Sequence, residues 1–199
     1  MDNGGLICLI AAGIPVLIGL IWFIASYNRF INLRNVIAES WSDIDTELKR
    51  RYDLIPNLVS TVKGYATHEQ AVFEAVTKAR TQAVASTGSA DSQAKDENVL
   101  VHALRQVLFV AESYPQLKAD RNFLELQKEL VNTEDRLQAA RRFFNGNTRE
   151  FNVLVESFPT SLIAGMFSFT RQGFFELDDL QARQPVAVEF GPRENGAGS

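Results

Sequence analysis

The chain has 199 residues, enough for one domain with a hydrophobic core. Its net charge of −4 at pH 7 argues against a nucleic-acid-binding protein, because such proteins usually carry a basic domain or stripe. Cys8 is the only cysteine, which excludes an intrachain disulfide and a CxxC metal site.

The N-terminal segment is predicted to cross a membrane. Leu6 to Tyr27 form an uncharged, mostly apolar run of 22 residues, and a helix rising about 1.5 Å per residue crosses a hydrocarbon core of about 30 Å at that length. Trp22 and Tyr27 lie near its C-terminal end, where aromatic rings favour the membrane interface. The sequence therefore predicts a short tail (residues 1–5) followed by a transmembrane helix (residues 6–27).

The alternative interpretation of this segment is a cleaved signal peptide. Such peptides have basic residues before the apolar run and small residues at the cleavage site, but residues 1–5 contain no Lys or Arg. A lipoprotein signal at Cys8 would need a small residue where Ile7 stands. A retained anchor is the favoured interpretation.

The distribution of basic residues predicts the orientation in the membrane. No Lys or Arg precedes the apolar run, whereas Arg29 and Arg34 follow it closely. Because basic residues concentrate on the cytoplasmic side, we expect a single-pass protein of the cell (inner) membrane, with a short outside N-terminus and a cytoplasmic C-terminal domain.

A long helix is predicted over residues 28–63, directly after the apolar run. Apolar residues recur there in steps of three or four, which defines one face of a helix that leads out of the membrane. The residues of this face are Phe30, Leu33, Ile37, Trp41, Ile44, Leu48, Tyr52, Ile55, Val59 and Val62.

Two shorter helices are predicted over residues 67–85 and 98–113. Thr67 followed three residues later by Gln70 is a capping-box pattern, which marks the start of the first of them. Residues 86–97 are rich in Ser, Gly and Asp and have no periodic apolar face, so we expect a loop there.

The fourth predicted helix, residues 117–158, has a regular heptad pattern. Apolar residues spaced by seven over this length predict lengthwise packing against neighbouring helices. Four helices with short connections give an all-α fold, an up-and-down four-helix bundle with long first and last helices, whose fourth helix returns toward the membrane. The seven-spaced residues are Phe123, Leu130, Leu137, Phe144, Phe151 and Phe158.

A phenylalanine-rich end (residues 159–177) and a flexible tail (residues 178–199) complete the predicted domain. The aromatic residues either cap the open end of the bundle as additional core or form a patch that faces the membrane or a partner. Within the tail we expect one short extended piece, Pro185 to Phe190. The candidate patch comprises Phe158, Phe167, Phe169, Phe174 and Phe175.

Pro56 interrupts the first long helix beside its densest group of charges. Its ring lacks an N–H and collides with the carbonyl of Tyr52, so the helix either kinks or restarts with Asp53 as its N-cap. We expect nearby basic side chains to satisfy the break and to pair with a fourth-helix stripe of seven-spaced polar residues, as a layer that sets helix register or binds a ligand or partner. The candidate residues are Asp45, Lys49, Arg50, Arg51, Asp53, Pro56, Asn57, Glu134 and Arg141.

The same segments resemble the LemA family. The resemblance is carried by "YNRFINLRNVIAESWSDIDTELKRRYDLIPNLVSTVKGYATHE" (Tyr27 to Glu69), by "YPQLKADRNFLELQKELVNTEDRLQAARRFFN" (Tyr114 to Asn145), and by the later "FNVLVESFP" and "FFE". It implies a bacterial membrane protein with one N-terminal span and a helical domain. Family members are associated with membrane organisation, including magnetosome membrane formation, and often occur beside genes for membrane zinc metalloproteases. The resemblance supplies no catalytic residues.

The sequence contains no recognisable catalytic motif. HExxH, a phosphate-binding Gly-rich loop, GxSxG and zinc-ligand spacing are all absent, and neither His68 nor His102 follows a glutamate by three residues, as a di-iron site would need. We therefore expect no enzyme and no cofactor, but a membrane-anchored scaffold or adaptor that binds a protein or organises the bilayer, with self-association open. The alternative is a small-ligand or lipid sensor that uses the polar layer near Pro56.

Overall fold

The computed structural model describes residues 3–177, with side chains from residue 13 onward, and every regular element in this range is a helix. The all-α class is thus confirmed. The predicted extended piece at residues 185–190 and the predicted flexible tail lie outside the described residues. The helices are α1 (Asn3–Lys63), α2 (Gln70–Ala85), α3 (Ala90–Glu112), α4 (Pro115–Lys118), α5 (Arg121–Glu156) and α6 (Thr160–Met166).

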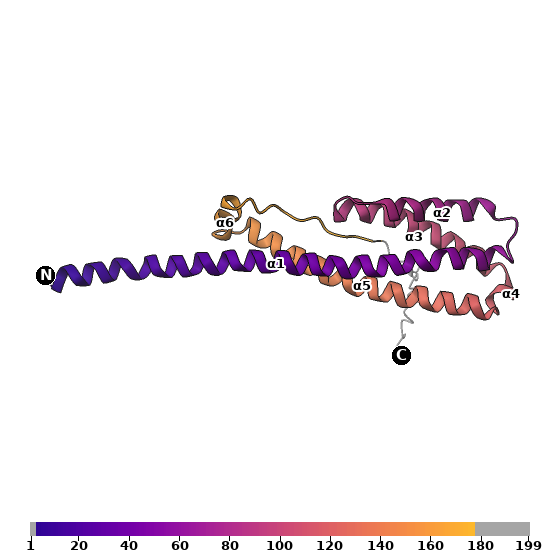
Figure 1. The fold of residues 1–199 in the computed structure, drawn as a ribbon, viewed down its shortest axis with the longest axis horizontal. Coiled ribbons are helices and arrows are strands. Elements are labelled where there is room, and N and C mark those ends of the chain that lie inside the picture. The colour runs from indigo at the N-terminus through magenta and orange to yellow at the C-terminus, as the bar shows by residue number, and fades with distance from the viewer. Residues whose placement is uncertain (1–2, 178–199) are drawn as a thin grey trace, which may run out of the picture.

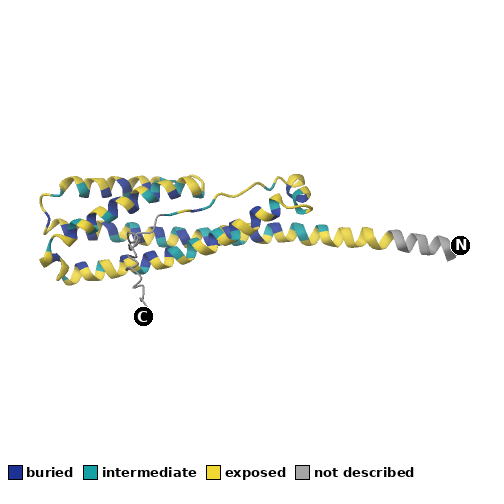
Figure 2. Ribbon diagram, turned by 180° about the vertical axis from the view of Figure 1, so that it is seen from behind, coloured by how far each residue is buried: buried dark blue, intermediate teal, exposed yellow. Residues whose placement is uncertain are grey.

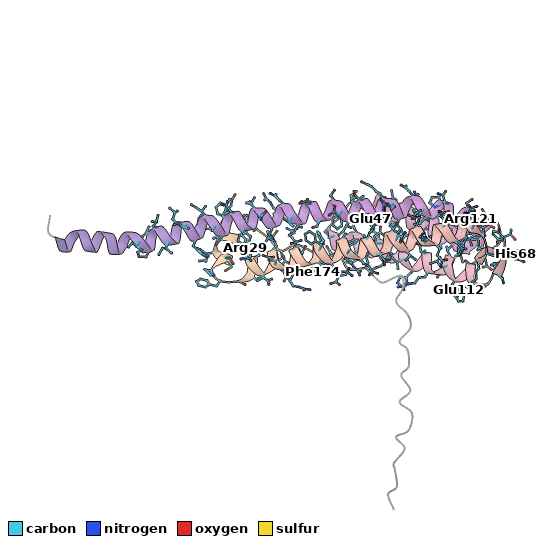
Figure 3. All side chains as sticks on the ribbon, turned by 90° about the horizontal axis from the view of Figure 1, so that it is seen from below. Arg29, Glu47, His68, Glu112, Arg121 and Phe174 are labelled. Carbon is cyan, nitrogen blue, oxygen red and sulfur yellow. The ribbon has the colours of Figure 1, made fainter. Side chains whose placement is uncertain are left out.

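Two long antiparallel helices, α1 and α5, run along most of the length of the molecule (Figure 1). α1 is an uninterrupted helix of 61 residues, or about 90 Å, and α5 runs back along its C-terminal half. The hairpin of α2 and α3 covers one end of this pair, which we call the distal end (Figure 1). Figure 3 shows His68, Glu112 and Arg121 together at the distal end, whereas Arg29 lies beside α6 at the other, proximal end.

Residues 13–22 of α1 extend beyond the packed helices, and all are exposed (Figure 2). Within the described residues, α1 is the one helix long and apolar enough to cross a membrane. Its exposed apolar side chains suit a lipid environment as well as they would suit a protein partner. One N-terminal apolar helix therefore is available as a membrane anchor.

The core is divided between the two ends. At the distal end, α1, α2, α3 and α5 all contribute buried apolar residues, among them Leu58, Val76, Leu104 and Leu130. At the proximal end, α1 and α5 pack on each other and on the segment after α5, with Phe30, Phe151 and Ile163 at the centre. Seven-spaced residues on α5 contribute to both cores, as predicted from the heptad pattern, with one exception: Phe158 follows the end of α5 at Glu156 and is exposed.

Two predictions for the short helices are wrong. α3 begins at Ala90, so most of the predicted loop over residues 86–97 is helical. Its first turns are polar because they face solvent over much of their surface, while Ala94 and Glu97 point inward. α2 begins at Gln70 with Glu69 at its N-cap and no side-chain cap hydrogen bond, so the expected capping box from Thr67 is not formed. The helix predicted to begin at residue 6 begins earlier, at Asn3.

Candidate functional site

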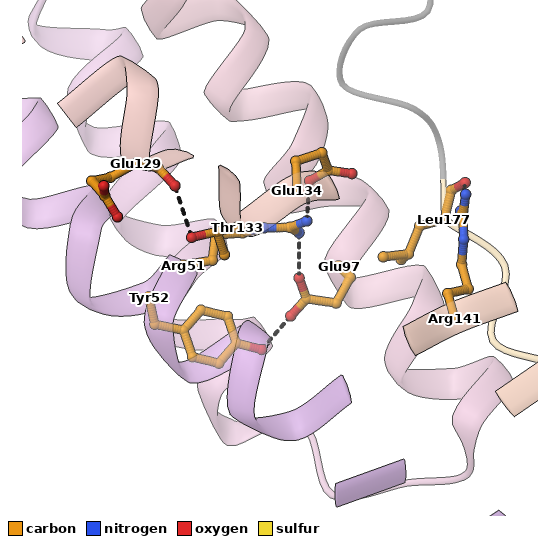
Figure 4. A network of polar contacts seen from close by, with 8 residues as sticks. All are labelled: Arg51, Tyr52, Glu97, Glu129, Thr133, Glu134, Arg141 and Leu177. Carbon is orange, nitrogen blue, oxygen red and sulfur yellow. Dashed lines mark hydrogen bonds and ion pairs between the residues drawn. The ribbon is translucent and has the colours of Figure 1, made fainter. Parts of the chain in front are cut away.

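Three ionisable side chains from three helices meet in the distal half of the molecule (Figure 4). Arg51 of α1 donates from Nη1 to Oε2 of Glu97 on α3 at 3.1 Å, and from Nη2 to Oε2 of Glu134 on α5. The Arg51 side chain is 0% exposed, and both carboxylates are buried. We call these three residues the ionic layer. This pairing is satisfied in one alignment of α1, α3 and α5, so the predicted role in setting helix register stays a prediction.

Arg51 occupies a position where the pattern of α1 requires an apolar residue. It lies seven residues after Ile44 and seven before Leu58, both buried. A guanidinium at such a position is costly unless it is paired. Within the "KRR" run Arg51 is the buried residue, since Lys49 and Arg50 lie on the exposed side of the helix.

The layer carries one more negative than positive charge when both glutamates are ionised. Burial raises the pKa of Glu97 above its ordinary value; Arg51 and the Tyr52 hydroxyl oppose this shift, and the second carboxylate, Glu134, adds to it. Burial and the adjacent Glu97 also raise the pKa of Tyr52 far above its ordinary range. The Tyr52 hydroxyl therefore stays protonated and donates to Oε1 of Glu97.

The other predicted members of the layer lie outside it. Lys49 pairs with Asp45 one turn earlier at 2.6 Å, and Arg50 pairs with Glu47 at 3.5 Å, so both cations form surface pairs within α1. Arg141, predicted on the same stripe as Glu134, instead donates to the carbonyl of Leu177. Asp53, Pro56 and Asn57 are exposed. A ligand at the layer would have to separate the helices to reach the buried guanidinium.

The helix passes through Pro56 without a restart. α1 continues to Lys63, so the alternative with Asp53 as an N-cap is wrong. The carbonyl of Tyr52, which loses its partner in the helix, accepts a hydrogen bond from Nε of Arg80 on α2 at 2.7 Å. The donor is thus supplied by another helix and not by the neighbouring Lys-Arg-Arg run, and the proline joins α2 to α1 at this point.

A further feature has no counterpart among the predicted sites. Residues 169–177, which we call the strap, run extended from α6 along the proximal core toward α3 (Figure 1). Asn152 accepts from the backbone N of Gln172 at 2.8 Å and donates to its carbonyl at 2.9 Å. Asn145 forms the same pair of bonds with Phe175, both at 2.9 Å. Each of the two asparagines on α5 therefore binds the backbone N–H and carbonyl of one strap residue, as a neighbouring β-strand would.

The strap also places aromatic rings in the core. The buried Phe175 makes an edge contact with Trp41 of α1, with 5.3 Å between ring centroids. Phe169 stacks on Phe30 at 4.7 Å and lies under the Arg34 guanidinium, whose Cζ is 6.0 Å from the ring centroid. Gly173 permits a close approach to α3, because a Cβ there would meet the Asp91 carboxylate at 3.0 Å.

The five predicted patch residues are therefore divided. Phe175 is core, Phe169 and Phe174 are half-buried, and only Phe158 and Phe167 are exposed. Both of the exposed rings belong to the turn region around α6, which we call the corner (residues 157–168). Of the other three, Phe169 and Phe175 belong to the proximal core, whereas Phe174 lies beside α3.

Residues 40–190 match the model of the LemA family. The chain belongs to the LemA family. The ionic layer, Pro56, both strap asparagines and the corner all lie within the matched residues. The resemblance predicted from the sequence is thus confirmed.

Curated relatives of this LemA-family chain include proteins of two kinds. The magnetosome protein MamQ of Magnetospirillum gryphiswaldense is 22% identical over 88% of this chain and 74% of its own length. Magnetosome protein MamQ 1 of Paramagnetospirillum magneticum is 22% identical over 75% of this chain, which spans 64% of that protein. Protein LemA of Metamycoplasma hominis is 24% identical over 82% of this chain and 76% of its own length.

Five residues that contribute side-chain hydrogen bonds to these sites in the LemA-family chain were not predicted to do so: Tyr52, Glu97, Arg80 and the strap asparagines Asn145 and Asn152. Glu97 was placed in a loop, although the apolar steps of α3 extended backward from Leu104 through Leu100 would have reached it. The two asparagines are seven residues apart on α5, and each directly follows a buried heptad residue, Phe144 or Phe151. That spacing is the only sequence signal for the strap.

The raised pKa of Glu97 has a measurable consequence. A folded-state pKa above the unfolded value means that the bound proton stabilises the fold; this contribution is fully present below the ordinary value of 4.5 and is lost as pH rises through the folded pKa. We expect the free energy of unfolding of Glu97→Gln, relative to that of the native chain, to increase as pH rises from about 4 to about 8, because only the native chain loses the stabilising proton. Denaturant unfolding of the full chain in detergent, followed by circular dichroism across that range, measures it.

Glu112→Gln is the matched control, since Glu112 is an exposed glutamate on the same helix. Its difference from the native chain should not follow the trend of Glu97→Gln. If the difference in unfolding free energy between Glu97→Gln and the native chain did not change with pH, this would contradict a raised pKa of Glu97 in the ionic layer.

Proposed function

We propose that this LemA-family protein is a single-pass, membrane-anchored helical scaffold that holds a protein-binding surface at a fixed distance from the bilayer, without catalysis of its own. Four helices packed up and down, as the sequence predicts, form the body of the scaffold. The association with membrane organisation that the LemA resemblance implies supports the proposal, and relatives named as magnetosome proteins are consistent with it.

One observation carries the proposal: the apolar anchor and the scaffold share a single helix. α1 passes from the exposed apolar residues before Asn28 into both cores without a hinge. An anchor that served only to tether a domain would tolerate a flexible linker. A continuous helix braced by the ionic layer instead fixes where the distal surface stands relative to the membrane.

The surface offers apolar side chains for a partner. Phe109 on α3 and Phe143 on α5 are 71% and 57% exposed, so most of each ring faces water. Phe143 lines a groove of about 350 Å³ between α1 and α5, together with Glu47 and Arg136. Exposed aromatic side chains beside charged residues are typical of protein-binding surfaces.

The partner and the orientation belong to the proposal. Arg29 and Arg34 follow the apolar residues directly, which favours a cytoplasmic domain at the inner membrane. A membrane-embedded protein, of which a membrane zinc metalloprotease is the kind implied by the family resemblance, would meet such a scaffold beside the bilayer. A reporter enzyme active only in the cytoplasm, fused after Ser199, tests the orientation: activity supports it, and activity of only an exported reporter overturns it.

Site-specific photocrosslinking tests the scaffold role. A photoreactive amino acid replaces Phe109 or Phe143 in the full chain, expressed in bacterial membranes, with the exposed Lys49 position as the control. We expect one defined protein adduct at an aromatic position that the Lys49 control lacks. Coexpression with a second tagged copy separates self-association from a foreign partner. Adducts no stronger than the control at both positions would overturn the proposed surface.

A further inference from the structure

We infer that the corner enters the interface of the same bilayer that holds α1, so that the protein contacts the membrane twice. This inference rests on the proposed membrane anchor. Lipid headgroups and the upper acyl chains are the occupant that we assign to the exposed apolar face of the corner.

The first observation is the absence of charge. From Ser157 to Thr170, 14 successive residues contain no Asp, Glu, Lys or Arg. The charged residues that flank this stretch, Glu156 and Arg171, pair with each other at 3.0 Å and close its base. The two charges are thus held outside the corner, and nothing ionic within it opposes entry into an apolar environment.

The second observation is that the corner has two apolar faces. Its inner face is satisfied, because Ile163 and Ala164 are buried in the proximal core. Its outer face is not covered by any described part of the chain. The exposed fractions on this outer face are 82% for Phe158, 61% for Leu162 and 70% for Met166. Leu162 and Met166 are one helical turn apart on α6 and so share a side.

The third observation is the position of the corner on α1. The Phe167 ring lies 4.6 Å from the Tyr27 ring and 6.1 Å from the Phe23 ring, measured between centroids. Phe23 and Tyr27 belong to the last two turns of the apolar run. When that run spans a hydrocarbon core of about 30 Å, these turns lie at the membrane interface. The corner is packed against them and therefore stands at the same depth.

Depth identifies lipid, and not a soluble protein, as the occupant. A protein partner would have to approach the outer face at the level of the lipid headgroups, where aromatic rings and apolar side chains already find a favourable solvent. Three basic residues lie near the corner, where they would meet the headgroup region: Arg34 over the Phe169 ring, and Arg29 and Arg171 in pairs with Glu150 and Glu156 of α5.

Quenching of a fluorescent label measures the depth directly. The native Cys8 is replaced by alanine, and single cysteines are introduced by Leu162→Cys, Met166→Cys, Leu17→Cys and Phe109→Cys in the full chain reconstituted into phosphatidylethanolamine–phosphatidylglycerol vesicles. Leu17 reports on the anchor and Phe109 on the distal surface. We expect a quencher placed deep in the acyl chains to quench the label at Leu17→Cys, and a quencher near the headgroups to quench the labels at both corner positions. Neither lipid-borne quencher should quench the label at Phe109→Cys, which should be the only label that aqueous iodide reaches.

Each outcome decides one part of the inference. Quenching of Leu17→Cys by lipid together with iodide access at both corner positions would overturn the corner contact and leave the anchor standing. Iodide access at Leu17→Cys would overturn the anchor itself. Shielding of the corner labels from both quenchers would overturn lipid as the occupant in favour of protein.

A second variant guards against an effect of the label. Phe158→Ser combined with Leu162→Ser removes apolar surface from the outer face but leaves Ile163 and Ala164 in the core and Phe167 against Tyr27. With the label at Met166, we expect loss of lipid quenching and gain of iodide access, while quenching at Leu17 stays unchanged. Unaltered quenching at Met166 in this variant would contradict insertion through the outer face.

Discussion

Arg51→Met is expected to lower the free energy of unfolding by about 3–5 kcal/mol, the cost of leaving buried charge without its partner. The methionine fills much of the volume of the arginine stem, so the loss comes from electrostatics more than from packing. Glu97 and Glu134 would then face each other without a cation in a layer that has no exposed surface at its centre. Denaturant unfolding of the full chain in detergent measures the change.

Two variants make this result interpretable. Lys49→Met removes an exposed pair only two residues away, whose side chains are 70% and 48% exposed, and should change stability by less than about 1 kcal/mol. Arg51→Met combined with Glu97→Gln and Glu134→Gln should recover most of the loss, because the amide oxygen at position 97 still accepts from Tyr52. Equal effects of Arg51→Met and Lys49→Met would refute a buried ionic layer.

Phe175→Ala is expected to release the strap. Truncation of a fully buried phenylalanine costs about 3–5 kcal/mol, and Phe175 is the point at which the strap enters the pocket beside Trp41 and Phe144. Because the strap is extended and held largely by side chains, it should open locally before the helices separate. Hydrogen exchange at the amides of Gln172 and Phe175, measured by mass spectrometry of peptides covering the strap, should become much faster.

Phe174→Ala is the matched control, since Phe174 neighbours Phe175 on the strap but is only half-buried. It should leave exchange at Gln172 close to the native rate. Slow exchange in Phe175→Ala would show that the paired hydrogen bonds of Asn145 and Asn152 hold the strap without the aromatic anchor, contrary to the expectation.

Helices whose buried residues recur at one regular spacing were predictable from the sequence. The steps of three or four on α1 and of seven on α5 are direct records of the face that each helix buries. Arg51 and Glu134 could be proposed as partners because both interrupt or flank such a pattern. The structure places the two side chains in hydrogen-bond contact.

Parts that depend on a single tertiary contact were not predictable. Pro56 leaves a carbonyl whose donor, Arg80, lies 28 residues from it in the sequence, and no local pattern connects the two. The first turns of α3 have a loop-like composition, which concealed Glu97. The strap follows no period, because its backbone is held by amide side chains of α5 and not by a repeating ladder.

The continuity of α1 has a mechanical consequence. About 54 Å of this helix, residues 28–63, stands beyond the apolar run. With no joint between the two parts, a change in tilt of about 10° within the bilayer would swing the far tip by about 9 Å. A change in membrane thickness that altered the tilt of the proposed anchor would thus displace the α2–α3 hairpin, and any protein bound to it, sideways.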